Sequence, residues 1–105
     1  MKKLIIAAGA ASLLLVLTLA AGQWTGHISD SKCGAAHSDH SEASIKCVRA
    51  CVKAGQKPVF VTEDKKVVKI ANPDKVMDYL GHQVRVTGKL EGDTLTIDAV
   101  ENVAP

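Results

Sequence analysis

Three cysteines and two histidines fall within one short stretch of this chain, and they constrain its folding more than any other feature. Cys33, Cys47 and Cys51 are its only cysteines, and His37 and His40 lie between the first two. A chain of 105 residues buries a modest core and often needs a covalent or metal cross-link. Thiolate and imidazole groups bind soft and borderline metals, and thiols also form disulfides. The stretch is therefore either a set of metal ligands or a staple.

The N-terminus has the pattern of a secretory signal. Lys2 and Lys3 precede an uncharged, Leu- and Ala-rich run, and small residues follow at positions 20–22. We predict cleavage after Gly22, with Ala20 and Ala21 as nearly equal alternatives, so that residues 1–22 are a signal peptide and residues 23–105 form a single exported domain, periplasmic or secreted. An uncleaved anchor is the alternative, since about 18 apolar residues is the lower limit for crossing a bilayer. In that case the membrane is contacted only through this segment.

Charge and composition argue against a nucleic-acid function. The chain has 13 Lys and Arg against 11 Asp and Glu, and Lys2 and Lys3 belong to the leader, so the mature part is close to neutral. Nucleic-acid binding needs a basic face and usually stacking aromatic side chains. Only Trp24, Phe60 and Tyr79 are available, and we expect no nucleic-acid partner.

The apolar pattern predicts a mainly β domain with two short helices. Alternating or β-branched runs predict strands over residues 23–30, 58–62, 67–70, 82–90 and 95–99. Trp24 is expected in the core.

Two helices are expected in the connections between these strands. The first runs over residues 42–54, with Ser41 as its cap and with Cys47 and Cys51 on its inward face. The second is short and starts after Asn72, with Pro73 at its first position. The Cys-bearing helix thus lies between the first and second strands, and the short helix between the third and fourth.

This order of elements is the chain order of the oligonucleotide/oligosaccharide-binding (OB) barrel, a five-stranded Greek-key barrel. The segment Gly81 to Gly88, followed by Leu95-Thr96-Ile97, resembles the last hairpin of bacterial members of that fold. A closer resemblance is to a family of small exported bacterial proteins of unknown function. It rests on Trp24-Thr25-Gly26, Ile28-Ser29-Asp30-Ser31, Cys33-Gly34, His37, Cys47, Cys51 and the Gly81 to Gly88 segment. The resemblance covers nearly all of the mature chain and implies an exported barrel-like domain with no known activity.

The cysteine stretch contains two donor pairs at the spacing of one helical turn. Cys33-x3-His37 and Cys47-x3-Cys51 together provide a Cys3His set, which suits zinc or, because thiolates are soft, copper(I). Cys33, His37, Cys47 and Cys51 are therefore the predicted metal ligands.

A disulfide from Cys33 to Cys47 or Cys51 is the alternative. It would stabilise the fold by about 2–4 kcal/mol by restricting the unfolded chain. A bridge between Cys47 and Cys51 fits disulfide geometry poorly, because both side chains leave one regular helix a turn apart. Either bridge to Cys33 leaves one thiol over in an oxidising compartment, which favours a ligand role or an intermolecular bond.

No catalytic arrangement stands out, and we expect the protein not to be an enzyme. Ser29, Ser31, His37 and Asp39 include the residue types of a hydrolase triad, but a triad is recognised by geometry.

The remaining polar residues have simpler explanations. His27 and His82 are expected at the surface, as is His40 if it binds nothing. Turn formation explains Asp30 and Ser31 more simply than a role in orienting a ligand histidine.

Two functions remain open from the sequence. The first is an exported, non-enzymatic binding module whose Cys/His cluster holds a transition metal. The second is a disulfide-stapled structural or interaction protein of the cell envelope, with a protein or polysaccharide partner.

Overall fold

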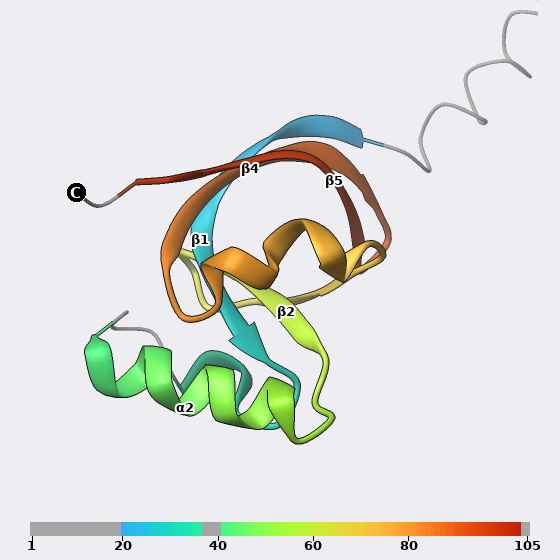
Figure 1. Ribbon diagram of the computed structural model, residues 1–105. Coiled ribbons are helices and arrows are strands. Elements are labelled where there is room, and N and C mark those ends of the chain that lie inside the picture. The colour runs from blue at the N-terminus through green and yellow to red at the C-terminus, as the bar shows by residue number, and fades with distance from the viewer. Residues whose placement is uncertain (1–19, 37–40, 104–105) are drawn as a thin grey trace, which may run out of the picture.

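The first strand is long enough to pair with two neighbours, and this closes the sheet into a barrel (Figure 1). The computed structural model describes residues 20–36 and 41–103. The strands are β1 (Ala20–Asp30), β2 (Pro58–Thr62), β3 (Val67–Ile70), β4 (Gln83–Glu91) and β5 (Thr94–Asn102). The first part of β1 pairs with β4 and its last part pairs with β2, in both cases antiparallel. The order around the closed barrel is β1-β2-β3-β5-β4.

Among residues 20–36 and 41–103, three helical segments lie in the connections between strands. They are η1 (Gly34–Ala36) and α2 (Glu42–Lys53) between β1 and β2, and η2 (Pro73–Tyr79) between β3 and β4. The η segments are 3-10 helices. The predicted fold class, a mainly β five-stranded barrel with helices in these two connections, is confirmed.

Strand β1 begins earlier than the sequence pattern indicates. It starts at Ala20, and Ala20 to Gly22 pair with Gly88 to Leu90 of β4. The predicted cleavage position after Gly22 therefore lies inside β1. Residues 1–19, which carry most of the predicted signal, are outside the described residues. Within residues 20–36 and 41–103, no helix is both long and apolar enough to cross a membrane.

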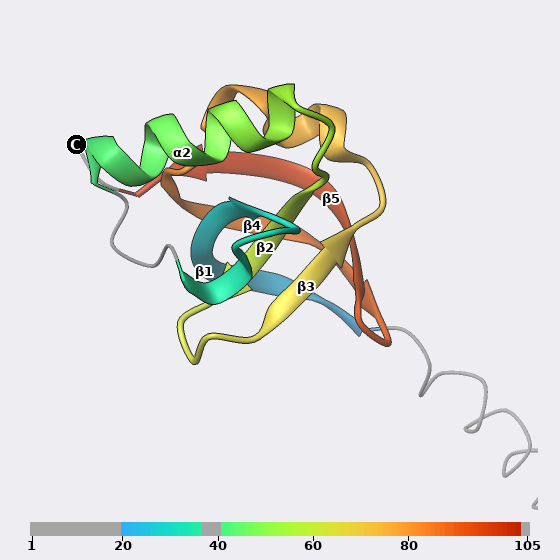
Figure 2. The ribbon, with the colours of Figure 1, turned by 90° about the horizontal axis from the view of Figure 1, so that it is seen from below.

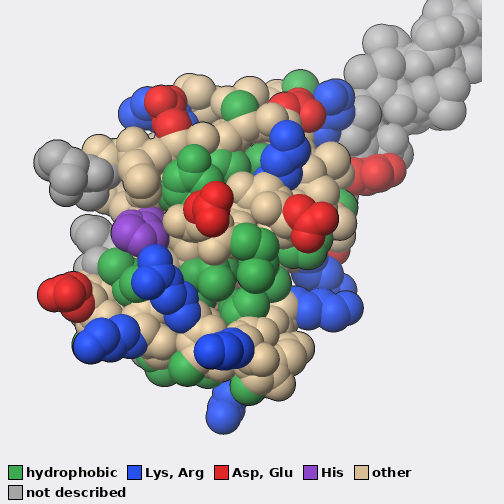
Figure 3. All heavy atoms as spheres, viewed as in Figure 1, with side chains coloured by type: hydrophobic (Ala, Val, Ile, Leu, Met, Phe, Trp, Pro, Cys, Tyr) green, Lys and Arg blue, Asp and Glu red, His purple; other side chains and the backbone are tan. Residues whose placement is uncertain are grey.

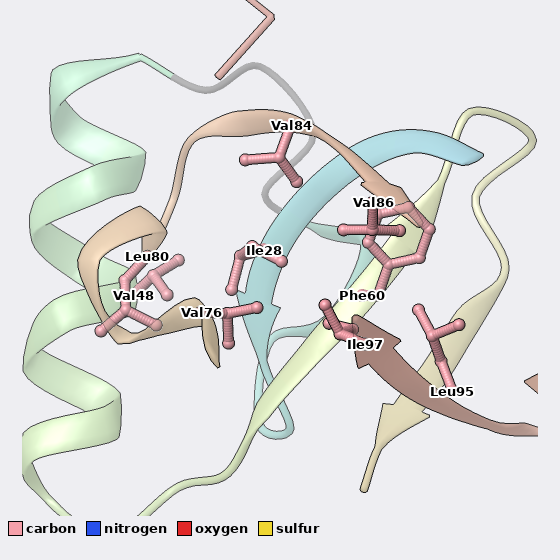
Figure 4. Packing of buried hydrophobic residues seen from close by; sticks show 9 residues of the cluster. All are labelled: Ile28, Val48, Phe60, Val76, Leu80, Val84, Val86, Leu95 and Ile97. Carbon is pink, nitrogen blue, oxygen red and sulfur yellow. The ribbon is translucent and has the colours of Figure 1, made fainter. Parts of the chain in front are cut away.

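The hydrophobic core fills the barrel and continues toward α2 (Figure 4). The strands contribute Ile28, Phe60, Val84, Val86, Leu95 and Ile97, η2 contributes Val76, the residue that follows η2 is Leu80, and α2 contributes Val48. Leu80 lies beside Val48 in Figure 4, so the connection that contains η2 links the barrel interior to the helix. Trp24, which was predicted in the core, packs against this cluster but remains half-buried, so it lies at the edge of the core.

The outer face of β1 and β2 is buried as well, which the sequence pattern does not indicate. His27 and Ser29 pair across the ladder with Val61 and Val59, and all four side chains are at most 7 % exposed. The segment η1 contacts both strands and lies across them (Figure 2). Ser29 Oγ donates a hydrogen bond of 2.7 Å to the Gly34 carbonyl and so holds the first residue of η1 against β1. The prediction that His27 is a surface residue is therefore wrong, because the cysteine connection folds over it.

The seam between β3 and β5 is short, and Asn72 lengthens it with its side chain. Only Lys69 and Ile70 pair with β5, in parallel, and the Ala71 amide donates to the Leu95 carbonyl at 2.9 Å. Asn72 Nδ2 then donates to the Ile97 carbonyl at 2.7 Å, and the Ile97 amide donates to Asn72 Oδ1 at 2.9 Å. Asn72 precedes η2 as predicted, but its side chain makes no cap bond because β5 uses both of its polar atoms.

Replacing Asn72 should weaken the barrel seam. Asn72→Ala removes two hydrogen bonds and leaves the Ile97 amide and carbonyl without these partners, so we expect a loss of about 2 kcal/mol in the free energy of unfolding. The measurement is urea unfolding followed by circular dichroism. Asn102→Ala, an exposed asparagine at the end of β5, serves as the control and should change stability by less than about 0.5 kcal/mol. Equal losses for the two variants would contradict this role of Asn72.

Gly81 allows α2 to approach the barrel closely. It has a φ of +81°, and a Cβ atom placed on it would lie 2.5 Å from Ile45 Cα. A side chain here is therefore opposed both by the backbone conformation and by the backbone of α2.

Alanine at Gly81 should destabilise the fold more than alanine at another left-handed glycine. Gly92 has a φ of +62°, and nothing lies within 4 Å of a Cβ placed there. Gly92→Ala should therefore cost only the backbone term of about 1–2 kcal/mol. Gly81→Ala should exceed it by about 1 kcal/mol or more because α2 must move. Chemical unfolding of both variants tests this, and a smaller loss at Gly81 would show that α2 is not held at this contact.

Candidate metal centre

Cys33 is held in a tight turn that follows β1. Asp30 Oδ1 accepts hydrogen bonds from the amides of Lys32 at 3.0 Å and Cys33 at 2.9 Å. An aspartate that accepts from amides two and three residues ahead stabilises a turn of this kind. The Cys33 carbonyl in turn accepts from the Ala36 amide at 3.0 Å, where η1 ends. The backbone around Cys33 is therefore fixed on both sides.

Cys47 and Cys51 lie one turn apart on α2. The helix begins at its predicted cap, where Ser41 Oγ accepts from the Ser44 amide at 3.2 Å. Val48 anchors the inward face in the core with 0 % of its surface exposed, and both cysteines beside it are half-buried.

The opposite face of α2 is basic. Lys46, Arg49 and Lys53 are exposed there, and Lys and Arg side chains gather on the side of the molecule that carries α2 (Figure 3).

Ser31 joins the two ends of the long connection. Its amide donates to the Lys57 carbonyl at 2.8 Å, and its Oγ accepts from the Lys57 amide at 3.1 Å and donates to Gln56 Oε1 at 2.9 Å. Because Gln56 lies three residues after the end of α2 at Lys53, these bonds bring the C-terminal end of α2 back to the turn that carries Cys33. The expected role in turn formation is confirmed for Asp30, whereas Ser31 bonds to the distant residues Gln56 and Lys57.

The three cysteines converge on one place beside the barrel wall. Their sulfur atoms all lie within 4.8 Å of one another, and none of them forms a disulfide in this structure. We call Cys33, Cys47 and Cys51 the thiol triad. Two sulfurs bound to one zinc ion lie roughly 3.5–4 Å apart, so the triad is close to the geometry of a shared ion. The prediction that distant thiols gather in one pocket is confirmed, and the predicted disulfide staple is not formed.

The surroundings of the triad disfavour thiolate in the absence of a cation. Burial, followed by the negative charge of Asp30 and the nearby thiols, raises the pKa of Cys33 from its ordinary 9.0 to about 11. Burial first and Asp30 second also raise the pKa of Cys51. These two thiols are therefore protonated at neutral pH and are poor nucleophiles, whereas a metal ion that binds them must displace their protons.

The convergence of the thiols does not extend to the histidines among the described residues. His37, the predicted fourth ligand, and His40 are outside the described residues, so their ligand roles stay predictions. His82 is half-buried just before β4.

One polar group near the triad was not predicted from the sequence. It is the second carboxylate oxygen of Asp30, which is buried and has no hydrogen-bond partner among the described residues. The only signal for it was an aspartate three residues before Cys33.

A separate surface feature lies at the other end of β2. It is an open groove of about 850 Å³ whose apolar part includes Trp24, Val68 and Leu90 and whose rim carries Glu63 and Lys66. None of the three thiols lines it, so the groove and the triad are independent features.

Comparison with known proteins supports part of the resemblance. A family described as a protein of unknown function (DUF5818) matches residues 52–103, from the last turn of α2 through β5. No curated protein and no solved structure matches the chain. The match begins directly after Cys51, so the thiol triad lies outside it. Bacterial origin and export stay predictions.

The raised pKa of Cys33 should be visible as slow alkylation. In metal-free folded protein, the rate of iodoacetamide reaction at Cys33 should rise with a midpoint near pH 11, because only the thiolate reacts. In urea-unfolded protein the midpoint should fall near 9. Asp30→Asn should lower the folded midpoint, since the carboxylate charge that raises the pKa is removed. Mass spectrometry of the Cys33 peptide across pH gives the rates, and identical folded and unfolded profiles would contradict the assigned environment.

Proposed function

We propose that the protein is an exported, non-enzymatic module that binds one transition-metal ion, zinc or copper(I), through the thiol triad. The observation that carries the proposal is the convergence of three sulfurs within 4.8 Å from two separate segments of the chain. Thiolate ligands suit both ions, since zinc accepts tetrahedral sulfur sites and copper(I) prefers soft donors.

The anchoring of the donors supports a site built for a ligand. Cys33 is fixed by the Asp30 turn, and α2 is fixed by Val48 in the core. A site whose donors sit on fixed backbone loses little freedom when the ion binds. Protonated, half-buried thiols also fit a ligand role better than a nucleophilic one.

His37 is proposed as the fourth ligand, as its spacing from Cys33 predicts. If it completes a tetrahedral zinc site, His37→Ala should lower zinc affinity while leaving a three-sulfur copper(I) site nearly unchanged. His40→Ala is the matched control from the same stretch.

Export is part of the proposal and rests on the N-terminal sequence. An envelope location would place the triad in an oxidising compartment, where a bound ion protects thiols from disulfide formation.

The second candidate function is the disulfide-stapled interaction protein of the cell envelope. The same proximity supports it, because two of the three sulfurs are near enough to be joined with modest movement. Thiol counting by alkylation and mass spectrometry on protein taken directly from the exporting cell separates the two. Three reduced thiols together with bound metal favour the first function. One reduced thiol and one disulfide favour the second.

Metal binding is tested on purified, tag-free protein under reducing conditions. We expect one equivalent of zinc or copper(I) by elemental analysis, and a rise in stability of about 2.7 kcal/mol when the free ion is at 100 times its dissociation constant. Cys33→Ser, Cys47→Ser and Cys51→Ser should each lower the affinity by more than the ~10–100-fold typical of losing an outer-shell partner.

The matched control for these variants is Ala50→Ser. It adds the same side chain to the exposed face of α2 and should leave metal binding unchanged. A wild-type protein that holds no ion and has the same unfolding midpoint with chelator as with metal would remove the proposal.

A further inference from the structure

Asp30 is a fully buried acid with one oxygen that the protein leaves unsatisfied. Its side chain is 0 % exposed at the end of β1. Oδ1 accepts from the amides of Lys32 and Cys33, whereas Oδ2 is buried and accepts no hydrogen bond from any described residue. Turn formation accounts for the first oxygen only.

Such a group is costly unless a cation compensates it. Buried carboxylates in proteins are normally hydrogen-bonded, paired with a basic side chain or placed beside a metal. The ion pairs found among the described residues join Lys69 to Asp93, Arg85 to Glu101 and Lys89 to Asp98, all at the surface. None of these pairs neutralises Asp30.

The thiol triad is the neighbour that Asp30 acts on. Its carboxylate influences the thiols of both Cys33 and Cys51 electrostatically, so its charge reaches donors on both segments of the site. The group of donors within 4.8 Å of one another nevertheless contains only the three cysteines among the described residues. Asp30 therefore stands beside the site and is not positioned as a ligand in it.

We propose that Asp30 is an electrostatic selectivity residue of the thiol triad, whose unsatisfied carboxylate oxygen favours a divalent cation, zinc, over monovalent copper(I). This inference rests on the proposed metal-binding function and adds the charge class of the ion. Asp30 acts through space on the bound ion, and the three sulfurs remain the ligands.

The charge of the ion decides how strongly Asp30 contributes. The interaction energy between two charges is proportional to their product, so at equal position the carboxylate attracts a divalent ion about twice as strongly as a monovalent one. Each ion also displaces the same thiol protons, and the carboxylate disfavours the resulting thiolates equally in both complexes. The preference of Asp30 for zinc therefore appears in the ratio of the zinc affinity to the copper(I) affinity. A purely structural role in the turn would change both affinities by the same factor.

Asp30→Asn separates the two roles. Asparagine keeps an Oδ1 acceptor for the amides of Lys32 and Cys33 and nearly the same size, but it carries no charge. Zinc affinity is measured against a competing zinc chelator, and copper(I) affinity against a competing copper(I) chelator under anaerobic, reducing conditions. We expect the ratio of the zinc affinity to the copper(I) affinity to fall about 3–10-fold in Asp30→Asn, because the lost charge acts on one more unit of charge in the zinc site.

Two further variants keep the test decisive. Asp98→Asn removes an equal charge from an exposed side chain that is ion-paired with Lys89. It should leave both affinities within about twofold, because solvent screens the charge of Asp98. Asp30→Ser, a second neutral variant that still accepts hydrogen bonds from turn amides, should reproduce the fall in the ratio of the zinc affinity to the copper(I) affinity if Asp30→Asn folds poorly. Unfolding curves of the metal-free variants report folding.

The outcomes are distinct. A fall in the ratio of the zinc affinity to the copper(I) affinity supports the inference. An unchanged or raised ratio overturns it while leaving the metal-binding function standing. If wild-type protein binds neither ion, the proposed function itself fails, and the inference fails with it.

Discussion

The closure of the barrel at the β3–β5 seam is the contact on which the rest of the structure depends. Only two residue pairs form that parallel ladder, and the side-chain amide of Asn72 continues it where the backbone turns away into η2. Once the seam is closed, Phe60, Leu95 and Ile97 face a common interior and are removed from water. Burial of this kind is the main force that stabilises the fold. A short seam is sufficient because β1 already joins the two halves of the sheet by pairing with both β2 and β4.

The same closed barrel provides the fixed wall against which the thiols gather. β1 ends at Asp30, and the chain turns there at once, held by the carboxylate of that residue. After α2, Ser31 captures the returning chain at Lys57, one residue before β2 begins. The long connection is thus fixed at both of its roots and again at Val48 and Gly81 along its length. Cysteines that are far apart in sequence meet because their segments are anchored independently to one rigid body.

Sequence patterns predicted the elements well and their long-range partners less well. Alternation and β-branched runs placed β2 and β3 at their observed bounds, and Ser41 marked the start of α2, because these signals are local. Cysteine spacing predicted which face of α2 carries the thiols. The burial of His27, the use of Asn72 on β5 and the unsatisfied oxygen of Asp30 were not predictable, since each depends on a segment that arrives from elsewhere in the chain. The role of His37 remains a prediction from spacing.

The early start of β1 has a consequence for the order of events in the life of this protein. Ala20 to Gly22 form backbone pairs with β4, and a peptide bond whose strand is hydrogen-bonded within a sheet is not free to enter the active site of a protease. If the leader is removed after Gly22 as its sequence predicts, maturation and folding compete for the same stretch of backbone. The peptidase must then act on a translocating, still unfolded chain, and a molecule that folds first escapes processing and keeps its leader.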